Sequence, residues 1–202
     1  MKKKILVYTR FERFWHWCQA ILILGLMVTG FEIHGTFRLT GFENAFLWHN
    51  YLSYALIAFS MFAIFWHFTT GEWKQYIPTM EKIGEMVCYY TKDIFKGKPH
   101  PFEKRPDRKL NPLQRITYFL LKVVIFPFQI GTGLVYLYND ELVQTGINLS
   151  TRTIAYLHTA GAFMFLVFLV IHVYLVTTGP TVCSHMKAMI TGWELIEDDL
   201  SA

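Results

Sequence analysis

The sequence is poor in charge and in cysteine. Charged residues make up 17% of the 202 residues, whereas hydrophobic residues make up 53%. A soluble domain of this length could not bury so much apolar surface, so the composition indicates a membrane protein. The three cysteines lie far apart and form neither a CxxC nor a CxxCH motif. This excludes covalent attachment of a c-type haem and gives no spacing typical of a zinc or iron–sulfur site.

Four long stretches are almost free of charge: 14–33, 46–68, 116–138 and 153–178. Each is long enough to cross a bilayer as a helix that rises about 1.5 Å per residue. We therefore predict an all-α integral membrane protein, a bundle of four transmembrane helices that forms a single domain over residues 1–202. The basic residues before the first stretch are not followed by a cleavage site of small residues, so we expect that stretch to be retained.

Lysine and arginine are unevenly distributed between these stretches. Residues 1–13 contain five and residues 69–115 contain ten, whereas 34–45 and 139–152 contain one each. By the positive-inside rule, both termini and the long middle segment face the cytoplasm. Within the middle segment, apolar residues of 73–95 recur every three or four positions. This pattern predicts a cytoplasmic amphipathic helix, lying on the membrane surface or against a partner.

The fourth stretch contains two histidines, His158 and His172. A histidine in hydrocarbon is costly and is a functional candidate by default. The two residues are 14 positions apart, which at about 100° and 1.5 Å per residue places them within ~40° of one helix face and ~21 Å apart along the axis. Each histidine is therefore expected near a different surface of the membrane.

Three further histidines lie in the first two stretches: His16, His49 and His67. The predicted helix directions place His49 at the outer depth of His158 and His16 at the inner depth of His172. Two imidazoles at one depth can occupy both axial positions of a haem iron, which suits electron transfer. His67 also lies near the inner surface and could replace His16. Because it is at the very end of its stretch, we expect instead an interfacial residue that water reaches and that lines a pocket.

Several motifs occur in order along the chain: Arg13-Phe14-Trp15-His16-Trp17, Thr29-Gly30, Asn111-Pro112-Leu113-Gln114-Arg115, Thr132-Gly133, and His158 with His172. Together they resemble the membrane cytochrome b subunits of bacterial respiratory nickel–iron hydrogenases, formate dehydrogenases and thiosulfate reductases, over nearly the whole chain. The resemblance implies a four-helix bundle that exchanges electrons with menaquinone or ubiquinone. It also implies two b-type haems, whose axial ligands are His16, His49, His158 and His172.

Further roles follow from the same resemblance for Asn111, Gln114 and His172, and from position in the sequence for the other candidates below. In the formate dehydrogenase branch the quinone lies near the inner haem, between the late histidine of the fourth helix and an N-x-x-Q motif. An apolar slot with a few hydrogen-bond donors suits a quinone, and capping of the third helix by Asn111 is the structural alternative. The quinone-pocket candidates are His67, Asn111, Gln114 and His172. Candidate contacts of the haem propionates are Arg13, Arg115 and Lys122. The two arginines can instead serve only to orient the chain in the membrane, and Lys122 can instead extend its side chain to the membrane surface.

Three functions fit this pattern. The first is an electron-transfer subunit in a bacterial or archaeal cytoplasmic membrane, without catalytic residues of its own beyond the quinone site. It would link the quinone to an iron–sulfur or multihaem partner subunit docked on the outer loops, 34–45 and 139–152. The second is a self-contained di-haem quinone oxidoreductase that oxidises a small reductant such as superoxide. The third is a non-redox membrane anchor. We expect lipid contacts and no nucleic-acid partner.

Overall fold

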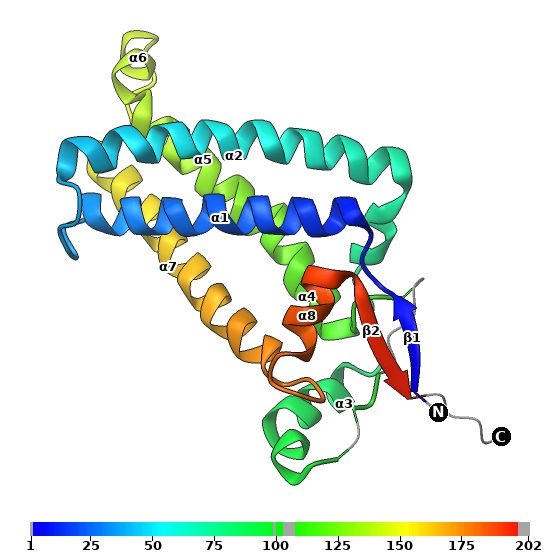
Figure 1. Ribbon diagram of the computed structural model, residues 1–202. Helices are drawn as coiled ribbons and strands as arrows, with labels where there is room; N and C mark the ends of the chain where they lie inside the picture. Colours follow the sequence, from blue (N-terminus) through cyan, green and yellow to red (C-terminus); the bar gives the residue numbers. More distant parts are fainter. Residues whose placement is uncertain (1, 99, 103–107, 198–202) are drawn as a thin grey trace. The chain divides into compact units, whose positions relative to one another are not determined.

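The computed structural model describes residues 2–98, 100–102 and 108–197, and it is predominantly helical. The long helices are α1 (Arg10–Ile33), α2 (Phe42–Thr70), α4 (Pro112–Leu120) continuing into α5 (Phe126–Leu137), and α7 (Thr151–Val176) (Figure 1). All four are long and apolar enough to cross a membrane. They confirm the four predicted apolar helices, and their ends differ from the predicted ones by at most four residues.

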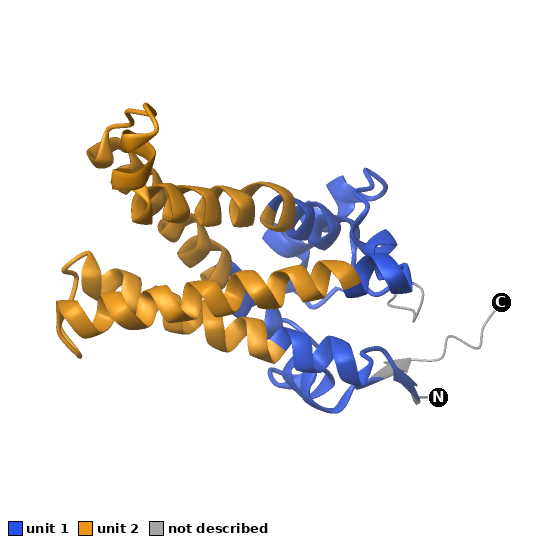
Figure 2. Cartoon of the chain, turned by 90° about the horizontal axis from the view of Figure 1, so that it is seen from above, with its two compact units in different colours: residues 1–16, 66–120, 171–202 blue, residues 17–65, 121–170 orange. Residues whose placement is uncertain are grey.

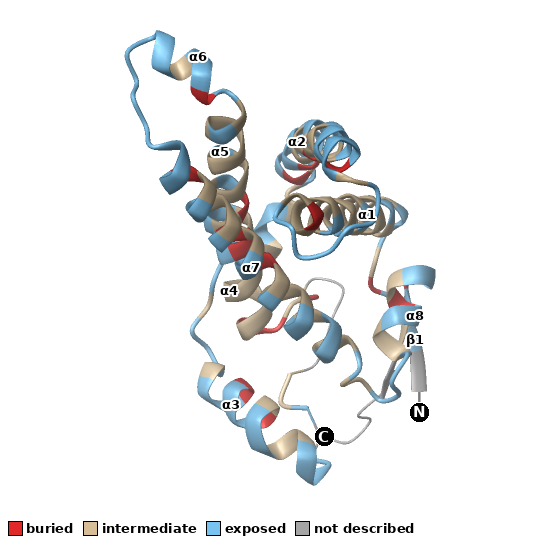
Figure 3. Cartoon of the chain, turned by 90° about the vertical axis from the view of Figure 1, so that its left-hand side faces the viewer, coloured by how far each residue is buried: buried red, intermediate tan, exposed pale blue. Residues whose placement is uncertain are grey.

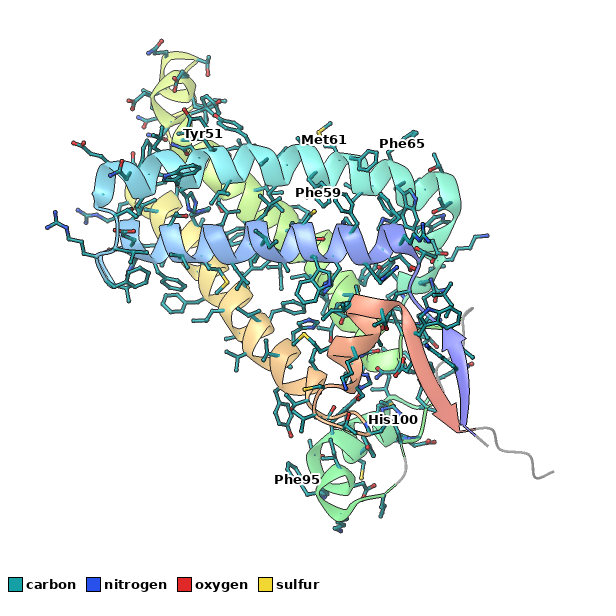
Figure 4. All side chains as sticks on the ribbon, in the orientation of Figure 1. Tyr51, Phe59, Met61, Phe65, Phe95 and His100 are labelled. Carbon is teal, nitrogen blue, oxygen red and sulfur yellow. The ribbon has the colours of Figure 1, made fainter. Side chains whose placement is uncertain are left out.

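The apolar side chains of these helices are largely exposed. In the most apolar part of each helix, between 0% and 17% of the residues are buried, and Figure 3 shows exposed residues along the helices. On α2, Met61 and Phe65 are 67% and 65% exposed and project outward (Figure 4). Apolar surface of this extent is unfavourable in water and is well accommodated by lipid. The exposure pattern is therefore that of helices in a bilayer.

The chain divides into two compact units (Figure 2). Unit 1 contains residues 1–16, 66–120 and 171–202, and unit 2 contains residues 17–65 and 121–170. Each unit holds one segment of each of the four long helices. The single domain over 1–202 stays a prediction.

The core of unit 2 is a cluster of four buried apolar residues, Leu56, Leu121, Phe126 and Phe165. The rings of Phe126 and Phe165 meet edge to face with their centroids 5.1 Å apart, a geometry that aromatic pairs prefer. Partly buried leucine and isoleucine side chains of α1 pack against the cluster. Side-chain packing within this unit therefore holds parts of α1, α2, α5 and α7 together.

The third long helix is not a uniform α-helix. Between α4 and α5, residues Leu121–Ile125 form a π-helical turn, η4. Pro127, near the start of α5, has no backbone N–H and cannot bond to the carbonyl four residues earlier. A wider turn before the proline accommodates the missing bond. Lys122 lies in this turn and is half-buried.

One carboxylate organises the connection between α1 and α2. Glu32 is 5% exposed, and its carboxylate accepts hydrogen bonds from the backbone N–H groups of Leu39, Thr40 and Gly41 at 2.6–2.7 Å. Gly41 has a φ of +91°, a conformation that favours glycine. Three N–H donors satisfy the buried charge, so this connection has a fixed backbone.

The amphipathic helix predicted over 73–95 is wrong. The segment contains four short elements, η1 (Glu72–Tyr76), α3 (Ile83–Cys88), η2 (Tyr89–Asp93) and η3 (Ile94–Lys96). A proline disfavours helical geometry at the residue before it, and Ile77, which precedes Pro78, is extended. Lys82, before α3, has a left-handed φ of +56°. The apolar period is present in the sequence, but the backbone does not follow it through Pro78.

A two-stranded sheet departs from the predicted all-α fold. β1 (Lys2–Leu6) pairs antiparallel with β2 (Trp193–Glu197), side by side in Figure 1. The Lys4 amine lies 5.3 Å from the centroid of the Trp193 ring, a cation–π contact. Beside the sheet, the guanidinium of Arg13 donates to the carbonyl of Ile190 in α8 (Ser184–Thr191) at 2.5 Å. Each strand depends on a partner from the opposite end of the chain, so no local pattern reveals it.

A buried ion cluster stabilises unit 1. The side chain of Lys109 is 9% exposed, and its amine lies 2.7 Å from Glu12 and 3.4 Å from Glu72. Glu12 also caps α1, because its carboxylate accepts from the N–H of Thr9 at 2.7 Å while the hydroxyl of Thr9 accepts from the N–H of Glu12 at 3.3 Å. The cluster therefore ties together the start of α1, η1 and the segment before α4.

Replacing Lys109 by methionine is expected to lower the free energy of unfolding by about 3 kcal/mol, because two partly buried carboxylates lose their cation. Arg108 is the matched control, since its ion pair with Glu81 is exposed, and Arg108→Met should cost less than about 1 kcal/mol. Thermal unfolding of both variants in detergent measures the difference. Equal effects would contradict the stabilising role of Lys109.

Candidate functional site

Four of the predicted histidines form two close pairs. The ring centroids of His16 and His172 are 6.2 Å apart, with an interplanar angle of 43°. Those of His49 and His158 are also 6.2 Å apart, with an angle of 82°. The first pair belongs to unit 1 and the second to unit 2, and all four residues are half-buried. These are the same two pairs that helix direction and depth predict.

A separation of this size fits one metal ion between two imidazoles. A metal–imidazole bond is about 2 Å long and the ring nitrogen lies about 1 Å from the ring centroid, so two such rings are about 6 Å apart. A direct N–H···N hydrogen bond of about 2.9 Å would bring the centroids to about 5 Å. Ordinary aromatic contacts span ~4.5–7 Å, so one pair alone is not diagnostic. The two pairs have the same distance between ring centroids but different interplanar angles. A metal ion between the rings would account for both observations, because it fixes the distance while each ring can rotate about its metal–nitrogen bond.

His49 is positioned by two adjacent residues of α1. Its Nδ1 lies 3.0 Å from Oγ1 of Thr29. The next residue, Gly30, leaves room for the ring, since a Cβ there would lie 3.2 Å from Cε1 of His49. A small residue is therefore needed where α1 passes the edge of this imidazole.

The same arrangement recurs at His158. Its Nδ1 lies 3.2 Å from Oγ1 of Thr132, and a Cβ on Gly133 would lie 2.9 Å from its Cε1. On the other side of the ring, the amide nitrogen of Gln129 is 3.2 Å from Nε2. The amide oxygen of Gln129 is buried and accepts no hydrogen bond from the part of the chain that the structure describes. A buried oxygen left unsatisfied beside a histidine indicates a pocket that a further group completes.

The sequence contains both Thr-Gly pairs, but it does not indicate their contacts with histidine. Thr29 precedes His49 by 20 residues and Thr132 precedes His158 by 26. Because the two separations differ, no internal repeat is visible. The local signal is a Thr-Gly pair late in one long helix followed by a histidine early in the next long helix.

His67 is not open to water in this chain. It is 8% exposed, and its ring packs against those of Trp15, Trp66 and Tyr76 at centroid distances of 5.1, 5.1 and 5.5 Å. The expectation of a water-accessible residue is therefore wrong, because aromatic side chains of α1, α2 and η1 surround it. The ring spaced 6.2 Å from His172 is that of His16.

Asn111 and Gln114 cap α4, which confirms the structural alternative. The N–H of Gln114 donates to Oδ1 of Asn111 at 2.8 Å, and the N–H of Asn111 donates to Oε1 of Gln114 at 3.0 Å. Asn111 is 3% exposed and donates to the hydroxyl of Tyr90 at 3.1 Å. That hydroxyl lies 3.2 Å from Nε2 of His100, and burial raises the pKa of Tyr90. Tyr90 and His100 thus extend the polar group in a way that the sequence does not indicate; His100 is labelled in Figure 4.

The three basic residues that are candidate propionate contacts do not all belong to one unit. Arg13 and Arg115 belong to unit 1, as do His16 and His172, whereas Lys122 belongs to unit 2. Arg115 donates to the backbone carbonyl before α4 at 3.3 Å. The contacts of both arginines with backbone carbonyls hold their guanidinium groups near the ends of helices.

Each histidine pair offers two imidazole rings as possible ligands. Within residues 2–98, 100–102 and 108–197, no group of three or more His, Cys, Asp and Glu side chains is placed to hold a metal ion. A haem supplies four ring nitrogens of its own and needs two axial ligands from the protein, so the donor sets fit haem. Apolar helices that carry such pairs are those of a membrane b-type cytochrome.

The family comparison agrees with this class. The family model described as "Prokaryotic cytochrome b561" matches residues 7–192, and the chain belongs to this family, which implies haem b. The chain is 27% identical over 198 residues to "Putative cytochrome YdhU" of Escherichia coli (strain K12), a match that covers 95% of this chain and 75% of the relative. No solved structure matches the chain. The family resemblance found in the sequence motifs is thereby confirmed.

Proposed function

We propose that this chain is a di-haem cytochrome b subunit that carries electrons across the membrane between a redox partner on the outer face and the quinone pool. The observation that carries this proposal is the presence of two histidine pairs, each with 6.2 Å between ring centroids, in two separate units of the chain. One pair alone would support a local redox site. Two pairs, which helix direction places at opposite membrane surfaces, support transfer across the bilayer.

His49 and His158 would hold the outer haem, and His16 and His172 the inner one. A b-type haem supplies one-electron redox chemistry, and two imidazoles fill both axial positions of its iron, which suits electron transfer. The buried amide oxygen of Gln129 and the close approach of Gly30 and Gly133 to histidine rings support a built cradle for the outer group.

The orientation has both termini and the middle segment in the cytoplasm. Its support is the excess of lysine and arginine in residues 1–13 and 69–115. The pairing of β1 with β2 joins residues 2–6 to residues 193–197, as expected when both ends of the chain are on one side. Residues 34–45 and 139–152 then face outward and are the proposed contact with an iron–sulfur or multihaem partner.

The proposed quinone site is at the inner end, near His172. Asn111 and Gln114, which cap α4, belong to the same unit as His172, and so does His67, which lies among aromatic rings. Apolar walls with a few polar groups suit menaquinone or ubiquinone. Arg13 and Arg115 are the proposed partners of the inner propionates because they belong to that unit as well. Lys122, in the turn that directly follows α4, is a further propionate candidate.

A methyl group on Gly133 is expected to weaken the outer haem. Gly133→Ala places a Cβ 2.9 Å from Cε1 of His158, so the ring must move, whereas nothing lies within 4 Å of the corresponding point on Gly131. The haem content of purified Gly133→Ala should therefore fall towards one per chain, while Gly131→Ala should keep the wild-type content. An equal loss of haem in both variants would show that the close approach of residue 133 to His158 is not the cause of the loss.

The function is tested by purifying the complex from native membranes in mild detergent. We expect a b-type signal in the reduced-minus-oxidised spectrum, co-purification of an iron–sulfur or multihaem subunit, and reduction of the cytochrome by added menaquinol or ubiquinol. Superoxide oxidation by the isolated chain would instead establish a self-contained oxidoreductase. Absence of a haem spectrum would establish a non-redox anchor.

A further inference from the structure

The two Thr-Gly pairs place the same chemical groups against His49 and His158. In each case a threonine Oγ1 lies beside histidine Nδ1, at 3.0 Å for Thr29 and 3.2 Å for Thr132. In each case the following glycine lies against Cε1 of the same ring. The two sites are built from different helices, α1 with α2 and α5 with α7. Because the same arrangement occurs on different helices, we attribute it to what the histidine ring requires and not to the packing of one particular helix pair.

The hydroxyl hydrogen of each threonine has another acceptor. Oγ1 of Thr29 donates to the carbonyl of Gly25 at 2.9 Å, and Oγ1 of Thr132 donates to the carbonyl of Phe128 at 2.8 Å. A hydroxyl has one hydrogen and two lone pairs, so towards histidine it acts as an acceptor. The facing Nδ1 atom must then carry the proton and donate.

A donating Nδ1 leaves the lone pair on Nε2. At His158 the side-chain amide nitrogen of Gln129 lies 3.2 Å from Nε2, so this amide must turn away from the ring before the same lone pair can bind a metal. Nε2 is thus the ring atom whose lone pair can bind a metal, while the ring orientation is fixed from the Nδ1 side.

We propose that Thr29 and Thr132 are positioning residues that set the tautomer and orientation of His49 and His158, so that both rings present Nε2 to the outer haem iron. This inference rests on the proposed haem ligation. An acceptor at Nδ1 also makes the imidazole more basic and favours the oxidised iron. The two threonines therefore set the reduction potential of the outer haem as well as its retention.

The test compares valine, alanine and serine at both positions in the full-length purified protein. Thr29→Val and Thr132→Val remove the acceptor, and we expect an upward shift of the outer haem potential, an altered low-spin electron paramagnetic resonance signal, and about 10- to 100-fold weaker haem retention. Thr29→Ser and Thr132→Ser keep the hydroxyl and should restore all three. Thr117→Val is the control, because its hydroxyl also bonds the carbonyl four residues earlier but faces no histidine in the described chain.

Serine and alanine differ only by the hydroxyl oxygen, so this pair decides the matter if valine prevents assembly. A wild-type potential and signal in the alanine or valine variants would overturn the inference and leave the haem ligation standing. Serine variants that behave like alanine would overturn it too, by showing that the methyl group matters. A wild-type chain without any bis-histidine signal would overturn the proposed function and this inference together.

Discussion

Replacing His16 by glutamine is expected to remove the inner haem and to leave the outer one bound. The ring of His16 has the 6.2 Å spacing from His172, and a glutamine amide is a poor substitute for an imidazole on haem iron. Haem content should fall by half, and electron paramagnetic resonance should lose one of two low-spin bis-histidine signals. The result should hold in detergent without any partner subunit.

His67 provides the matched comparison, because it is the other histidine near the inner surface. We expect His67→Gln to retain both haems and to slow quinone turnover, since His67 is a candidate wall of the quinone pocket and its replacement changes the shape and polarity of that wall. His67 packs against Trp15, Trp66 and Tyr76, so its replacement can also slow turnover by destabilising the fold. Thermal unfolding of the variant detects this second effect. Survival of the inner signal in His16→Gln together with its disappearance in His67→Gln would reverse the assignment.

The two histidines of α7 are expected to separate the two haems. His158→Ala should remove the outer haem, and His172→Ala the inner one, because the two residues pair with different partners in different units. Each variant should retain about half of the haem, with a different axial signal lost in each. His34, an exposed histidine between α1 and α2, is the control, and His34→Ala should retain both haems. A variant of His158 or His172 that keeps both haems with unchanged axial spectra would exclude the assigned ligands.

The helices and the histidine pairing could be predicted because both depend on local or additive properties. Uncharged runs of membrane-spanning length identify the four helices, and charge asymmetry gives each helix a direction. Direction and position then place each histidine at one depth, which was enough to pair His16 with His172 and His49 with His158. The order of motifs around Arg13 and Asn111 gave the family.

The remaining features depend on contacts between distant segments. The sheet requires residues 2–6 and 193–197 to meet, and the burial of His67 requires Trp15 and Tyr76. The role of Thr29 appears only once α1 lies against His49. The broken helix over 73–95 is different, because Pro78 is visible in the sequence and its effect on the backbone outweighs the apolar period.

The most direct test of this account is the number of haems per polypeptide. Pyridine haemochrome analysis of the purified wild-type chain, with protein quantified by amino-acid analysis, should give two b-type haems per chain. Two is expected because each of the two histidine pairs, which have equal spacing, can provide both axial ligands of one haem. One haem per chain, or none, would contradict it.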